Sequence, residues 1–423
     1  MSAQASRVIE QYERYVMGTY ARTPLIITKA KGSRVWDIDG RVYLDLFPGW
    51  GVSGIGYNHP WVTQAIRGQS QRVIHVSNNY YHPLQARAAK KLVDHAFDGK
   101  VFFCNSGAEA VEGAIKLARR WGDGRYEMIV MERSFHGRTM GALSATGQAK
   151  HQEGFEPLLP GFVRVPFHDL AAIDRAVTSK TCGVLIEPIQ GEGGIRVVAS
   201  ELLRGLRRLC DERKLLLIAD EVQTGMGRTG TWFAYQESGI EPDILLLAKT
   251  FGGGFPIGAI VARREIADVL GPGTHATTFG GSPMACAAVL AVFEAIEKQR
   301  LLDRVKTLAP RIVKRLEVLK ARTSVIREIR GRGFMVGVEV SIEGRPIVDA
   351  CRAQGLLINC TQGNVLRLLP AMTITRSELE RGLSLFERVV LSVRSDGTLG
   401  AVQPVKRSGS GPAGQASARR ALT

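Results

Sequence analysis

The chain has 423 residues, 45% of them hydrophobic, and a formal net charge of +16. This length and apolar content allow a sizeable core and suit two domains. No apolar stretch approaches the roughly 18–20 residues that span a bilayer, and residues 1–4 begin no hydrophobic signal segment, so we expect a cytoplasmic protein.

The first 60 residues predict a helix followed by a small sheet. Residues 33–44 read as two short strands around Asp39 and Gly40, a dipeptide that favours a tight turn. We expect this segment to pack with a small domain at the other end of the chain.

Residues 101–110 predict a strand that leads into the start of a helix. The apolar run 101–103 precedes Asn105-Ser106-Gly107, and small and apolar residues then recur at helical spacing. The free N–H groups and the positive dipole end of such a helix attract an anion. The Ser106 hydroxyl offers another donor, although an ordinary helix cap is the simpler alternative.

Two further strands are expected to end in polar or glycine-rich turns. Residues 127–131 are followed by Phe135 and Arg138, which could cover a planar cofactor and bind a substrate carboxylate, respectively. His136 between them is interpreted as a structural or stacking residue rather than a catalytic base. Residues 182–187 form the second strand and run into a turn with three glycines.

The next two strands are predicted to bring a lysine close to an aspartate. Residues 215–219 lead to Asp220, and residues 242–248 lead to Lys249 and three glycines. The carboxyl ends of neighbouring parallel strands face one crevice. In pyridoxal phosphate (PLP) chemistry a lysine forms the Schiff base, and an aspartate keeps the pyridine nitrogen protonated. Without the aspartate, the lysine could equally be an ordinary solvated residue at the end of a strand.

The whole chain divides into four predicted parts. Residues 1–60 form the N-terminal segment, 61–305 a large domain with a mostly parallel sheet, and 306–395 a small α/β domain. Residues 396–423 have few large apolar side chains, so we expect a disordered basic tail. The six cysteines include no Cys-x-x-Cys pair and are expected to be free thiols, with no metal site.

Seven sequence blocks resemble the class III aminotransferases, which are PLP enzymes of fold type I. They are NSGAEAVEGAIKLARR at 105–120, SFHGRTMGALSATGQ at 134–148, EPIQGEGG at 187–194, DEVQTGMGRTG at 220–230, LAKTFGGGFPIGA at 247–259, HATTFGGSPMACAA at 275–288 and INCTQGNVLRLLP at 358–370. The resemblance implies an α/β fold with a mostly parallel seven-stranded central sheet, helices on both of its faces and a smaller α/β domain. It also implies pyridoxal 5'-phosphate as cofactor and a homodimer with active sites shared across the interface.

The resemblance further implies roles for individual residues. Lys249 and Asp220 would be catalytic. The cofactor would be bound by Ser106, Gly107, Ala108, Phe135, Asp220, Glu221, Val222, Gln223 and Lys249, and by Thr278 of the partner subunit. The substrate would be bound by Arg138, Thr277, Glu192, Arg367 and Trp50. Glu192 and Arg367 would form a switchable pair, for which a static surface ion pair is the alternative.

Within this family the motifs are most similar to the N-acetylornithine aminotransferases. That similarity implies transfer of an amino group from acetylornithine to 2-oxoglutarate. The ornithine, succinylornithine and 4-aminobutyrate aminotransferases remain alternatives, since the bulky Trp50 could alter the choice of acyl group.

The net charge also raises a non-enzyme alternative, a basic nucleic-acid-binding protein. Lys and Arg are scattered along segments such as 303–322 without interleaved aromatic residues, and no nucleic-acid-binding motif is present. We therefore expect no specific nucleic-acid partner.

Overall fold

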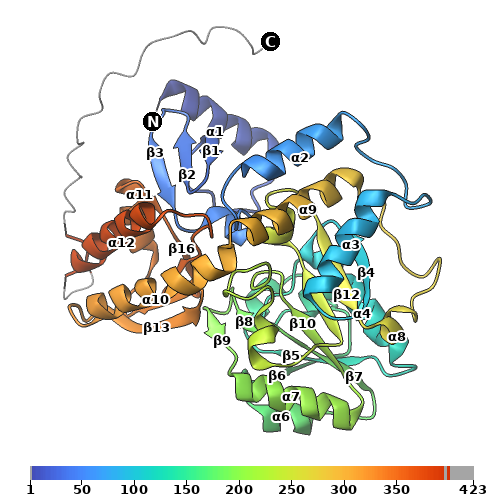
Figure 1. Ribbon diagram of the computed structural model, residues 1–423. Coiled ribbons are helices and arrows are strands. Elements are labelled where there is room, and N and C mark those ends of the chain that lie inside the picture. The colour runs from blue at the N-terminus through green and yellow to red at the C-terminus, as the bar shows by residue number, and fades with distance from the viewer. Residues whose placement is uncertain (1, 395–397, 401–423) are drawn as a thin grey trace.

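The computed structural model describes residues 2–394 and 398–400 (Figure 1). Most of the tail predicted at 396–423 lies outside the described residues. Within residues 398–400, Leu399 forms a β-bridge with Val393. In the described part of the chain, no helix has the length and apolar character needed to cross a membrane.

A seven-stranded sheet forms the centre of the molecule, in the order β4-β12-β11-β10-β7-β5-β6. Its strands are β4 (Lys100–Cys104), β5 (Glu127–Met131), β6 (Phe162–Val165), β7 (Thr181–Ile186), β10 (Leu216–Asp220), β11 (Ile244–Leu247) and β12 (Gly258–Ala262). Only β12 is antiparallel to its neighbours, and the other pairs run parallel. The predicted mostly parallel seven-stranded sheet is therefore confirmed.

Helices cover both faces of this sheet, which explains why its strands are continuous apolar runs. Two successive residues of one strand show the two faces. Leu246 of β11 packs in the same cluster as α4 (Gly107–Trp121), whereas Leu245 packs in the cluster of α9 (Pro283–Lys298). α7 (Ser200–Arg213) covers Leu217 and the adjacent strands. The remaining helices are α1 (Ala3–Tyr15), α2 (Pro60–Ser70), α3 (Pro83–His95), α5 (Met140–Ala145), α6 (Leu170–Ala176), α8 (Arg264–Ala267), α10 (Leu301–Lys320), α11 (Arg345–Ala353) and α12 (Arg376–Leu391).

Two smaller four-stranded sheets are formed by strands from the N-terminal and C-terminal parts of the chain. The first contains β1 (Ile27–Lys31), β2 (Arg34–Asp37), β3 (Val42–Asp45) and β15 (Leu356–Leu357), and the second contains β13 (Ile326–Arg332), β14 (Met335–Val340), β16 (Asn359–Thr361) and β17 (Val365–Leu368). β15 pairs in parallel with β3, so this sheet joins the N-terminal segment to the C-terminal part. The division of the chain into four parts stays a prediction. The short β8 (Ile189–Gln190) and β9 (Arg196–Val197) form a separate ribbon.

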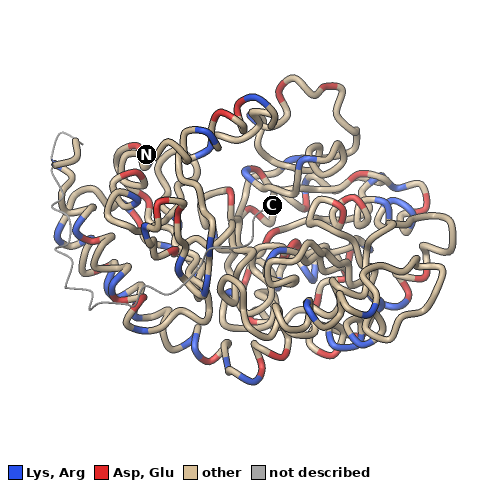
Figure 2. Tube along the Cα trace, turned by 90° about the horizontal axis from the view of Figure 1, so that it is seen from above, with Lys and Arg blue, Asp and Glu red and all other residues tan. Residues whose placement is uncertain are grey.

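The positive net charge is not concentrated in one stripe of the described chain. Figure 2 shows Lys and Arg interspersed with Asp and Glu over many elements.

Candidate active site

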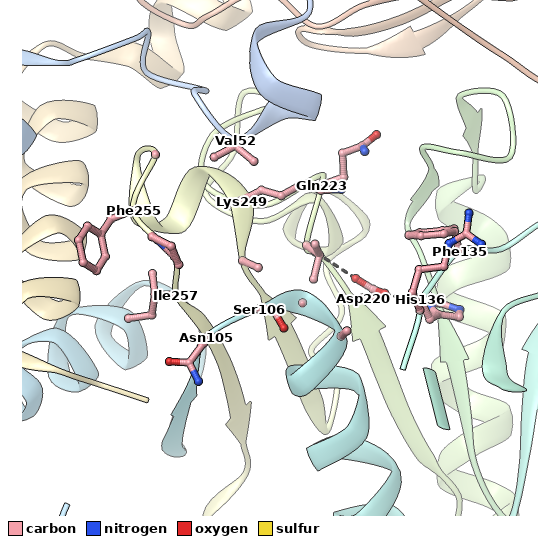
Figure 3. Close-up of a pocket in the computed structure, with 18 residues that line it drawn as sticks. Val52, Asn105, Ser106, Phe135, His136, Asp220, Gln223, Lys249, Phe255 and Ile257 are labelled. Carbon is pink, nitrogen blue, oxygen red and sulfur yellow. Dashed lines mark hydrogen bonds and ion pairs between the residues drawn. The ribbon is translucent and has the colours of Figure 1, made fainter. Parts of the chain in front are cut away.

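A pocket of about 480 Å³ opens at the carboxyl ends of β4, β10 and β11 (Figure 3). It combines residues from segments that are far apart in the sequence. Those that the sequence had singled out are Ser106, Gly107, Ala108, Phe135, Arg138, Asp220, Val222, Gln223 and Lys249. Val52, Asn105, His136, Gly137, Ala248 and residues 254–257 complete the lining. The reversed direction of β12 brings its start, rather than its end, to this edge.

The start of α4 forms one end of the pocket. Ser106 caps the helix by accepting a hydrogen bond from the Glu109 N–H at 3.2 Å, which leaves other N–H groups of the first turn free for a ligand. Gly107 is closely packed, because a Cβ there would lie 3.0 Å from a methyl group of Val222. A backbone this close to the pocket, at the positive end of a helix, suits a phosphate group.

Asp220 is held in the pocket by two hydrogen bonds. One carboxylate oxygen lies 2.7 Å from Nδ1 of His136, and the other accepts from the Val222 N–H at 3.1 Å. Both Asp220 and His136 are almost completely buried. From the sequence we expected a structural or stacking role for His136 and did not predict this contact. The place of His136 directly after Phe135 is the one sequence signal for it.

Lys249 follows β11 and begins a short 3-10 turn, η4 (Lys249–Gly252). Its backbone has φ +50°, a left-handed conformation that is uncommon outside glycine. Burial lowers the pKa of Lys249, while the nearby carboxylates of Glu192, Asp220 and Glu187 act in the opposite direction. Within the described chain the amine makes no hydrogen bond or ion pair, so it is available to react.

Glu187 is a buried carboxylate that the sequence analysis did not single out as a site residue. It follows β7, whose Ile186 pairs with Ala219 of β10, so Glu187 and Asp220 are neighbours at the sheet edge. Glu187 accepts a hydrogen bond from the Phe135 N–H at 3.1 Å. Burial and the charge of Asp220 raise its pKa well above the ordinary value. A protonated Glu187 avoids placing two adjacent negative charges in the site.

The predicted pair of Glu192 and Arg367 is present, and it is not a surface ion pair. Arg367 on β17 is 0% exposed, and its Nη1 and Nη2 donate to Glu192 at 2.5 and 3.1 Å. Its Nε also donates to Asn359 at 2.8 Å. The ring centroids of Phe47 and Trp50 lie 4.8 and 5.4 Å from the guanidinium carbon. The ion pair is therefore buried rather than exposed on the surface, and its ability to switch stays a prediction.

The backbone of Glu192 is fixed independently of its side chain. Its carbonyl oxygen accepts from Thr361 Oγ1 at 2.9 Å and from Gln362 Nε2 at 2.7 Å. Any movement of the carboxylate away from Arg367 must therefore occur by side-chain rotation. Arg138, by contrast, is exposed and forms no ion pair among the described residues.

Six residues predicted for the site are not among those that line this pocket: Glu192, Arg367 and Trp50, described above, and Glu221, Thr277 and Thr278. Glu221 is fully buried and accepts hydrogen bonds from the Ala234 and Tyr235 N–H groups, both at 2.8 Å. Successive side chains alternate sides at a strand end, so Asp220 faces the pocket and Glu221 faces the core. Thr277 accepts from Asn105 Nδ2 at 2.9 Å, and Thr278 is exposed on the same loop.

The residues present fit PLP. The start of α4 suits its phosphate, the buried carboxylate of Asp220 suits a protonated ring nitrogen, and the free amine of Lys249 suits the aldehyde. Gln223 Oε1 is buried without a hydrogen-bond partner among the described residues, as expected of a group that binds a polar ligand. In the described chain no group of three or more His, Cys, Asp or Glu side chains is placed to hold a metal ion.

Comparisons with known proteins show what the sequence of this chain is similar to. The sequence model of the family "Aminotransferase class-III" matches residues 15–390. The acetylornithine aminotransferase of Caldanaerobacter subterraneus subsp. tengcongensis is 46% identical over 393 residues, which cover 92% of this chain and 100% of that protein.

Two solved structures illustrate the similarity of fold. An ornithine aminotransferase from Toxoplasma gondii, described with partial occupancy of PLP at its active site, superposes with a TM-score of 0.89 at 33% identity, over 92% of this chain and 94% of that one. The acetylornithine aminotransferase of Elizabethkingia anophelis gives a TM-score of 0.83 at 30% identity, over 92% and 99%.

Proposed function

Because this chain belongs to the class III aminotransferases, we propose that it transfers the δ-amino group of N2-acetyl-L-ornithine to 2-oxoglutarate. The products are N-acetyl-L-glutamate 5-semialdehyde and L-glutamate, which places the reaction in arginine biosynthesis. The cofactor is PLP. When bound, it supplies an electron-accepting ring and carries the amino group between the two substrates.

The observation that carries this proposal is the unequal state of two arginines. Arg138 lines the pocket without a carboxylate partner, whereas Arg367 is neutralised by Glu192. With Arg138 free and Arg367 neutralised, the site suits a substrate with one carboxylate. Acetylornithine is such a substrate, and its α-amine is acetylated and therefore uncharged. Release of Arg367 by rotation of Glu192 provides the second cation that 2-oxoglutarate requires.

The chain's own residues perform the remaining tasks. Lys249 anchors the cofactor and carries the proton between the substrate carbon and the cofactor, a task suited to an amine with a lowered pKa. Asp220, fixed by His136, keeps the ring nitrogen protonated. The first turn of α4 holds the phosphate, and Phe135 covers the ring.

We also propose a homodimer in which Thr278 contacts the phosphate in the partner's site. Large apolar side chains are exposed near this loop in the single chain, among them Tyr80 at 68%, Tyr81 at 106% and Phe279 at 61%. Exposed aromatic residues on this scale are typical of an interaction surface. The six free cysteines support the proposed location in the reducing cytoplasm.

A panel of amine donors tests the proposed reaction. Acetylornithine, succinylornithine, ornithine and 4-aminobutyrate are each supplied with 2-oxoglutarate, and glutamate formation is followed. Acetylornithine should give the highest kcat/KM. A higher value for another donor would replace the proposed substrate, and the absence of the visible absorbance of bound PLP would overturn the enzyme class itself.

A further inference from the structure

We propose that Glu112 is a positioning residue that sets the place of Arg138 relative to the phosphate-binding start of α4. Glu112 lies outside the pocket lining, so it acts through other residues. The inference rests on the proposed function, because it assigns to Arg138 the binding of substrate carboxylates.

A single carboxylate oxygen of Glu112 receives three hydrogen bonds from the segment that follows Arg138. Oε1 accepts from Thr139 Oγ1 at 2.6 Å, from the Gly141 N–H at 2.8 Å and from the Ala142 N–H at 3.1 Å. The side chain of Thr139, the N-cap residue of α5, makes no capping hydrogen bond of its own. The N–H groups at the start of α5 are therefore satisfied by a residue of another helix.

Close packing one turn earlier on α4 strengthens this connection. Ala108 and Glu112 are four residues apart and lie on one face of the helix. A Cβ on Gly137 would lie 2.9 Å from the Cβ atoms of both Ala108 and Ala142, so the loop backbone rests directly on α4. A Cβ on Gly141 would likewise lie 2.4 Å from Glu112 Oε2. Residues 137–142 thus follow the first turns of α4 closely.

The consequence is a fixed spacing between two anchoring groups. The first turn of α4 lines the pocket at Gly107 and Ala108, and Arg138 lines it from the loop. Glu112 is the charged contact that ties that loop to α4. Its loss should let Arg138 shift while the start of α4 stays in place. A shift of about 1 Å in a substrate-positioning group can change rates up to about 100-fold.

Two substitutions at Glu112 separate its hydrogen bonds from its volume. Glu112→Met keeps the length and removes the acceptor, whereas Glu112→Gln keeps one acceptor oxygen. We expect Glu112→Met to raise the KM of both acetylornithine and 2-oxoglutarate about tenfold, with kcat changed less than about twofold. Glu112→Gln should restore most of this loss. Glu201→Met, at an exposed ion pair on α7, is the matched control and should have no effect.

Binding of maleate, a dicarboxylate that cannot react, provides a readout that is independent of turnover. Its Kd, measured by calorimetry on the PLP-loaded protein, should rise in parallel with KM, while PLP content and the absorbance spectrum stay unchanged. If wild-type enzyme made no glutamate from acetylornithine, the proposed function would fail, but the maleate measurement would still test Glu112.

Thr139→Val covers the case in which Glu112→Met does not fold, because it removes one of the three bonds and leaves α4 intact. It should weaken maleate binding less than Glu112→Met, and the double variant should be no weaker than Glu112→Met alone. Unchanged maleate affinity in Glu112→Met or in Thr139→Val would overturn the inference. So would a fall in PLP content with KM unchanged, since that pattern indicates a purely structural role.

Discussion

His136 donates a hydrogen bond from Nδ1 to Asp220 at 2.7 Å, and the two side chains are 0% and 5% exposed. In such a dry environment a charged hydrogen bond is worth more than in water, and it fixes the direction of the carboxylate. The Val222 N–H holds the second oxygen. Asp220 is thus presented to the pocket in one orientation.

His136→Phe should slow turnover per PLP-loaded site by about tenfold, because Asp220 loses the donor that orients it. Asp220→Asn should slow it by about 100-fold or more, and adding His136→Phe to that variant should have little further effect. Turnover normalised to PLP content is the measurement. If both substitutions lowered only thermal stability, the pair would have a purely structural role.

Lys249→Ala should lower turnover at least about 1,000-fold, because one residue both anchors the cofactor and carries the proton. The variant should keep some PLP through the phosphate site while losing the visible band of the covalently attached cofactor. Absorbance spectra and PLP released on denaturation measure the two effects separately. Turnover near the wild-type rate would show that another residue has this role.

Glu192→Ala should leave the glutamate half-reaction intact or faster and slow the acetylornithine half-reaction about tenfold. The reason is that Arg367, fully buried, keeps an uncompensated charge when only one carboxylate is present. Stopped-flow absorbance follows each half-reaction separately. Glu192→Gln is the matched control, because it removes the charge but keeps the size of the side chain. It should also slow the acetylornithine half-reaction and leave the glutamate half-reaction intact or faster. Equal slowing of the two half-reactions would exclude a switchable pair of Glu192 and Arg367.

Thr278→Ala should weaken PLP affinity by about 10-fold to 100-fold, the range expected for a hydrogen bond to a charged group. Mixed dimers of Thr278→Ala and Lys249→Ala subunits test the contact across the interface. One site should then carry both defects and the other neither, so the active half should bind PLP with wild-type affinity. Weak PLP binding in the active half would place the contact within one chain.

Glu221→Gln should keep PLP bound and alter the pH dependence of stability. Burial raises the pKa of Glu221 from 4.5 to about 7, so its stabilising contribution is fully present below about pH 4.5 and is lost as the pH rises through 7. The free energy of unfolding of the wild type, relative to the variant, should fall by on the order of 3 kcal/mol over that range. Urea unfolding at several pH values measures it. If the difference in unfolding free energy did not change with pH and the variant lost PLP, Glu221 would be a cofactor-binding residue instead.

The sequence predicted those features of the site that follow from strand ends. Asp220 and Lys249 come directly after apolar runs, and Ser106 follows one with only Asn105 between. A mostly parallel sheet gathers such residues at one edge. Contacts that depend on tertiary packing were not predictable in this way. The bond from His136 to Asp220 joins residues 84 positions apart, and the position of Glu187 beside Asp220 requires the register of β7 and β10. Glu221 was misplaced because adjacency in sequence does not specify which side of a strand end a side chain faces.

The reversed direction of β12 limits how this protein can change. Because β12 lies antiparallel beside β11, residues 248–257 join the two strands without the longer crossover that parallel neighbours need. This short connection contains Lys249 and the pocket residues 254–257. An inserted residue here would alter the pocket wall itself, since Ala248, Lys249 and residues 254–257 line the pocket. Substrate specificity at this edge can therefore change by substitution of side chains rather than by a change in the length of the connection. Engineered libraries should accordingly vary residue types here and keep the length constant.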